Sequence, residues 1–148
     1  MAISDFVKHD ADTKAGAWRV KFYLLWSALL VLKLLLASQM QLFGDEAFYA
    51  WEAARPAWAY SDLPGMTAWL IRLGLEFGGY YPLTARLCFV VIGAVIPFFI
   101  IRIARRFSNE IQQGETQVWQ AGALSCCLPL LLPTGVLALP EAPLCLAA

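Results

Sequence analysis

Two long apolar stretches dominate the hydrophobic pattern of the chain. They cover about residues 20–40 and 83–103, and each has the roughly 20 residues that a helix needs to cross the hydrocarbon of a membrane. A third, shorter apolar run covers residues 118–134, and a further one begins just before the sequence stops at residue 148. The pattern predicts an all-α integral membrane protein with about three transmembrane helices in an incomplete bundle.

The connection between the first two stretches, residues 41–82, is polar and aromatic, and it contains two short helical patterns. Asp45 to Ala54 is helix-prone and ends before Pro56, and its residues 45, 49 and 52 share one helix face. The second pattern starts at Met66 and places apolar side chains on one stripe, which is typical of a helix lying in the membrane interface. That stripe consists of Met66, Trp69, Leu70, Leu73 and Phe77.

Composition supports a membrane location. Of the 148 residues, 60% are hydrophobic and 15% are charged, whereas soluble domains have about 45–50% and about 25%. Eleven basic residues balance eleven acidic ones, so no net field attracts nucleic acid, and membrane lipid is the expected surrounding. The four cysteines and the single histidine show no metal-ligand spacing, so the residues themselves predict no metal site.

The distribution of basic residues predicts the orientation. They are frequent before the first crossing and after the second, whereas the connection 41–82 is acidic, so the N-terminus is expected in the cytoplasm and the connection outside. Residues 1–17 form a polar cytoplasmic tail, and residues 18–148 form the transmembrane part. About twenty polar residues precede the first crossing, which therefore reads as a retained anchor and not as a cleaved signal.

Asp45 and Glu46 follow the first crossing directly and are the first candidates for chemistry. One interpretation is structural, because carboxylates stabilise the first turn of a helix by about 0.3–1 kcal/mol. The other is functional, since a carboxylate at the lipid–water boundary can accept a proton or help to hold a cation. The two side chains differ by about 100° around a helix, so they cannot both point equally well into one site.

Two basic residues lie within the apolar stretches. Arg86, near the outer end of the second crossing, either extends its head group to the interface or holds a phosphate by bidentate hydrogen bonds. Lys33 lies near the middle of the first crossing and is expected to face protein or water. A structural role and a functional role both remain open for each of them.

Residues 44–74, GDEAFYAWEAARPAWAYSDLPGMTAWLIRLG, resemble the first outer loop of polytopic glycosyltransferases that use polyprenyl-phosphate-linked sugars. These families include protein O-mannosyltransferases and lipid A aminoarabinose transferases. The resemblance continues to the end of the chain, but the usual His-Pro-Pro of the family is Leu63, Pro64 and Gly65 here, and a late aspartate is Glu141. The matching pieces are Gly44 to Ala47, Tyr60 to Pro64, Ala68 to Gly74, Ala85 to Leu87, Arg105 to Phe107 and Leu139 to Leu144.

The resemblance implies transfer of a sugar, with inversion, from a polyprenyl-phosphate donor to a lipid, glycan or protein acceptor at the outer face of a bacterial inner membrane. Asp45, with Glu46 beside it, would supply the catalytic carboxylate, and Arg86 would stabilise the leaving phosphate. Tyr60, Asp62 and Glu141 would join Arg86 in binding substrate. No cofactor is required by the resemblance, although some members hold a divalent cation near the outer loop.

Such enzymes have several hundred residues, so the chain is expected to be the N-terminal portion of one and to be inactive by itself. Two other classes of protein remain open at this point. One is a non-catalytic membrane module with the same architecture, used for binding or assembly. The other is a transporter, in which Lys33 and Arg86 would line the path.

Overall fold

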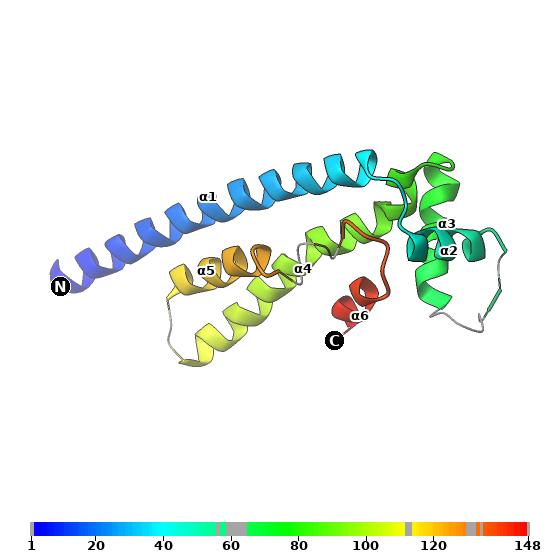
Figure 1. Cartoon of the computed structure of the whole chain (residues 1–148). Helices are drawn as coiled ribbons and strands as arrows, with labels where there is room; N and C mark the ends of the chain where they lie inside the picture. Colours follow the sequence, from blue (N-terminus) through cyan, green and yellow to red (C-terminus); the bar gives the residue numbers. More distant parts are fainter. Residues whose placement is uncertain are drawn as a thin grey trace. The chain divides into compact units, whose positions relative to one another are not determined.

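The computed structural model describes residues 2–55, 57–58, 65–111, 114–129, 133 and 135–147. This described part of the chain is all α, with six helices and no sheet, as the sequence predicts (Figure 1). The helices are α1 (Ala2–Gln39), α2 (Gly44–Ala53), α3 (Gly65–Gly78), α4 (Pro82–Ile111), α5 (Glu115–Cys126) and α6 (Glu141–Ala147).

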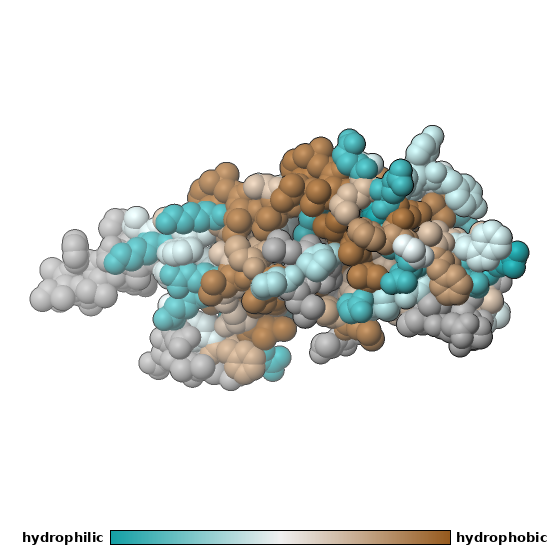
Figure 2. Space-filling view, viewed as in Figure 1, coloured by the Kyte–Doolittle hydropathy of each residue, from teal (hydrophilic) through white to brown (hydrophobic). Residues whose placement is uncertain are grey.

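Two of these helices are long and apolar enough to span a membrane. The spans are Asp12–Gln39 within α1 and Pro82–Ser108 within α4, and they include the first two predicted crossings. Large apolar side chains of α1, such as Leu24, Val31 and Leu35, are exposed (Figure 2), which suits a helix surrounded by lipid.

The third predicted crossing, residues 118–134, differs from the structure. Helix α5 has 12 residues and ends at Cys126, which makes it about 18 Å long against a hydrocarbon thickness of about 30 Å. Pro129 gives the physical reason, because it has no N–H to donate and disfavours helical backbone at the residue before it. Residues 130–132 and 134 of this run lie outside the described residues.

The contacts divide the chain into two compact units, residues 1–29 with 97–128, and residues 30–96 with 129–148. The first unit has an aromatic core around Phe22, which is fully buried. The ring of Phe22 meets Phe98 edge-on at 5.6 Å and lies 5.7 Å from the ring of Trp119. Its other buried members are Ile101, Val118 and Cys126.

In the second unit, both predicted helices of the connection 41–82 are present, and α2 packs against α3. Helix α3 buries one face, which includes Ala68 and Ile71. Its other apolar stripe, with Trp69 and Phe77, stays exposed, as the sequence predicts for the side of a helix that faces a membrane interface.

Close packing at Gly74 of α3 sets the distance to the start of α4. A Cβ atom at this position would collide with the backbone carbonyl of Thr84, which cannot rotate away as a side chain would. The Gly74→Ala variant is therefore expected to destabilise the second unit by about 1–3 kcal/mol. Thermal unfolding followed by circular dichroism in detergent micelles measures the effect.

The matched control is Gly44→Ala, because a Cβ atom at Gly44 meets nothing within 4 Å. Gly44 opens α2, where alanine has the better helix propensity, so this variant is expected to melt at or slightly above the wild-type temperature. Equal melting temperatures for both variants would contradict the close packing at Gly74.

Candidate functional site

A buried ion pair between Glu46 of α2 and Arg86 of α4 forms the centre of the second unit. The two side chains are 1% and 0% exposed. The guanidinium binds the carboxylate with two parallel hydrogen bonds, from Nε to Oε1 at 2.9 Å and from Nη2 to Oε2 at 2.5 Å. This bidentate geometry is the strongest arrangement available to an arginine–carboxylate pair.

Arg86 also binds the end of α1. Its Nη1 donates to the carbonyl oxygens of Ala37 at 3.1 Å and Met40 at 2.8 Å, and its Nη2 donates to that of Gln41 at 3.0 Å. A guanidinium has five N–H donors, and these five hydrogen bonds use all of them. Carbonyl groups at a helix C-terminus have no partner within the helix and carry partial negative charge, so Arg86 caps α1.

The carboxylate of Glu46 is equally saturated. Its Oε1 accepts a second hydrogen bond from the backbone N–H of Ala138 at 2.7 Å, and its Oε2 accepts one from the N–H of Phe43 at 3.1 Å. Burial acts to raise the pKa of Glu46, but the hydrogen bonds from Arg86, Ala138 and Phe43 outweigh it, and the pKa lies below its ordinary value. The carboxylate is therefore charged at neutral pH. Through its own bonds and those of Arg86, the ion pair joins the end of α1, the start of α2, α4 and the segment before α6.

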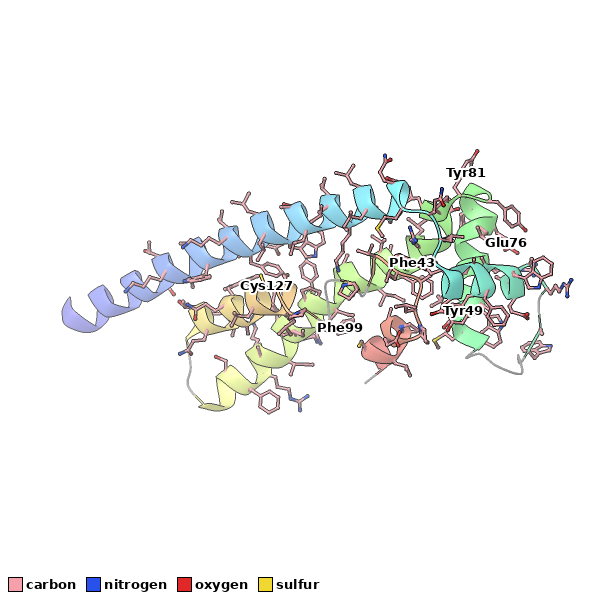
Figure 3. All side chains as sticks on the ribbon, in the orientation of Figure 1. Phe43, Tyr49, Glu76, Tyr81, Phe99 and Cys127 are labelled. Carbon is pink, nitrogen blue, oxygen red and sulfur yellow. The ribbon has the colours of Figure 1, made fainter. Side chains whose placement is uncertain are left out.

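Asp45 has the opposite environment. It lies on the first turn of α2, and its side chain is exposed. Tyr49, which is labelled in Figure 3, is half-buried. It follows Asp45 by four residues and therefore shares its face of the helix. Burial raises the pKa of the Tyr49 phenol first, and the negative charges of Asp45 and Glu141 raise it further.

The charges of Asp45 and Glu141 both act on Tyr49, although the two acidic residues are far apart in the sequence. Glu141 is exposed at the first turn of α6. The phenol of Tyr49 carries one O–H donor, and the negative charges of both carboxylates act on it. Asp45, Tyr49 and Glu141 form the acidic cluster of the candidate site.

The structure places the predicted site residues in different environments. Asp45 and Glu46 point into different environments, as their rotation around the helix predicts. Arg86 is buried with all its donors used, so in this arrangement it offers none to a phosphate, which differs from the role expected for it. Tyr60 and Asp62 lie outside the described residues.

Sequence reasoning missed the pairing of Glu46 with Arg86 and the participation of Ala138. The signal for the pairing is present, because an arginine inside an apolar span requires a partner and Glu46 lies at the end of the neighbouring span. The backbone N–H of Ala138 carries no sequence signal at all.

A divalent cation finds no complete set of ligands in the described part of the chain. No three histidine, cysteine, aspartate or glutamate side chains gather there as ion ligands, and the acidic cluster supplies only two carboxylates.

Comparison with known proteins gives no relative. The chain matches no family model, no curated protein and no solved structure.

Proposed function

We propose that the chain forms part of a membrane glycosyltransferase that moves a sugar from a polyprenyl-phosphate donor to a lipid, glycan or protein acceptor. The observation that carries the proposal is the exposed carboxylate of Asp45, beside Tyr49 and Glu141, at the start of the helix that follows an apolar span. The resemblance of residues 44–74 to the first outer loop of such enzymes supports the same function.

In this proposal, Asp45 is the catalytic base. It accepts the proton from the hydroxyl or amine of the acceptor while the acceptor atom forms a bond to the anomeric carbon of the sugar. The bond between that carbon and the phosphate oxygen breaks, and polyprenyl phosphate leaves with the electron pair. Attack opposite to the leaving group inverts the sugar configuration.

The ion pair between Glu46 and Arg86 has a positioning role in this proposal. It attaches the first turn of α2 to the end of α1. Asp45 lies between Phe43, which precedes α2, and Glu46, and these two residues share a hydrogen bond. A catalytic base misplaced by about 1 Å loses about 10²-fold in rate, so a fixed first turn matters. Arg86 acts through Glu46 and is not assigned to the phosphate.

Location in a bacterial inner membrane, with the N-terminus in the cytoplasm and α2 and α3 outside, completes the proposal. It rests on the asymmetry of basic residues and on the two spans. On that side of the membrane, the lipid tail of the donor enters from the bilayer while its sugar-phosphate head meets the acidic cluster.

The test uses the protein from the complete reading frame, reconstituted into vesicles with a polyprenyl-phosphate donor that carries a radiolabelled sugar. We expect label to appear on a lipid, glycan or protein acceptor, with release of unlabelled polyprenyl phosphate. Binding of donor without that release would instead support the non-catalytic module. Movement of label across the vesicle membrane without transfer would support the transporter.

A further inference from the structure

The first unit contains an open groove that the proposed sugar transfer does not use. Its volume is about 810 Å³, within the range of about 300–1,000 Å³ that is typical of small-molecule sites. One face of α1 forms most of it, and one residue each from α4 and α5 completes it. The lining residues are Arg19, Val20, Tyr23, Leu24, Trp26 and Ser27 of α1, Arg105 of α4 and Trp119 of α5.

The groove is amphipathic. Its α1 wall runs for about 12 Å, from Arg19 to Ser27, and the lining residues between these two are apolar or aromatic. The exposed apolar side chains of Val20 and Leu24 belong to the membrane-length part of α1. Tyr23, Trp26 and Trp119 are residue types that concentrate where a membrane meets water.

Two guanidinium groups give the groove its charge. Arg19 is exposed and has no ion-pair partner among the residues that the structure describes. Arg105 lies 5.7 Å from the ring centre of Trp119 and donates from Nε and Nη2 to the carboxylate of Glu115, at 3.0 and 3.2 Å. That ion pair is exposed, so an anion of higher charge density can compete with Glu115.

We propose that this groove binds an anionic phospholipid of the surrounding bilayer. The phosphate head group lies between Arg19 and Arg105, and an acyl chain lies along Val20 and Leu24. Charge complementarity selects an anionic lipid, because basic pockets beside transmembrane helices bind such head groups. The continuous apolar wall selects a lipid over a free phosphate. The inference needs the membrane location of α1 but not the sugar transfer.

The test measures binding of phosphatidylglycerol and phosphatidylcholine to the purified chain in detergent by native mass spectrometry. We expect phosphatidylglycerol to bind more tightly, and the Arg19→Gln variant to lose about fivefold in its affinity for that lipid. The matched control is Arg102→Gln, which removes the same charge from an exposed position of α4 that does not line the groove. Equal losses in both variants would overturn the proposal, since diffuse attraction to basic residues would then explain the binding.

Two further variants distinguish lipid binding in the groove from a general attraction of the lipid to basic residues. Glu115→Gln removes the carboxylate that competes for Arg105, so phosphatidylglycerol affinity is expected to rise several-fold. Ser27→Phe fills the groove without a change of charge and is expected to abolish the preference for phosphatidylglycerol, whereas Ala28→Phe, at an exposed neighbour outside the lining, should retain it. An unchanged preference in both Glu115→Gln and Ser27→Phe would exclude this groove as the lipid site.

Discussion

Replacement of Asp45 by asparagine is expected to lower the turnover of the complete protein by about 10²–10⁴-fold, the usual cost of removing a general base. Asparagine keeps the shape of the side chain and part of its hydrogen-bonding capacity but cannot accept the proton. Because Asp45 is exposed on the first turn of α2, folding is expected to survive the change. The release of polyprenyl phosphate in the reconstituted vesicles gives the rate.

Glu52→Gln is the matched control for this prediction. Glu52 lies on the same face of α2 as Asp45 and Tyr49, about two turns from Asp45, and its substitution removes the same charge from the same helix. Turnover close to the wild-type value is expected. If a well-folded Asp45→Asn protein retained wild-type turnover, Asp45 would be reduced to a carboxylate that stabilises a helix start.

The second large effect is expected at the buried ion pair, where Glu46→Ala should lower the free energy of unfolding by about 3–5 kcal/mol. The loss is large because Arg86 would keep its charge in a buried position without the carboxylate. Denaturation of the purified chain in mixed micelles, with helix content as the signal, measures it. The matched control is Arg72→Ala, which breaks the exposed pair between Arg72 and Glu76 and should cost at most about 1 kcal/mol.

A double variant, Glu46→Leu with Arg86→Met, sharpens this prediction. Replacement of a buried ion pair by apolar residues of similar size is often neutral. Here the pair also satisfies two buried backbone groups, the carbonyl of Ala37 and the N–H of Ala138, and each buried group left without a partner costs about 1–3 kcal/mol. The double variant should therefore recover only part of the lost stability. Full recovery would show that these backbone bonds contribute little.

The helices of this chain are the part that the sequence predicts best. The apolar stretches around Phe22 and Phe89 have the length and composition of membrane spans, and Pro56 marks the region where α2 ends. The apolar stripe that starts at Met66 predicts α3, which covers Gly65–Gly78. The predicted third span is longer than helix α5, because the apolar run 118–134 contains Pro129, which interrupts a helix.

The candidate site was harder to predict, because its contacts join distant parts of the chain. Periodicity placed Asp45 and Tyr49 on one face and rotated Glu46 away from them. Hydropathy alone could not show that Glu46 and Arg86, which are 40 residues apart, would satisfy each other. Arg86 neither extends to the interface nor leaves a donor for a phosphate, because its partners are groups of the protein.

The residues of the ion pair are synthesised in a fixed order, and this order matters for the insertion of α4 into a membrane. Glu46 is synthesised first, and at about 5–20 residues per second Arg86 follows about 2–8 s later. An arginine that enters hydrocarbon alone costs about 2.5–3.5 kcal/mol. In the proposed membrane location, Arg86 would enter after its carboxylate partner has reached the membrane boundary. The N–H of Ala138, 92 residues after Glu46, completes the carboxylate's bonds last. We therefore expect the insertion of α4 to depend on Glu46, which is synthesised before it.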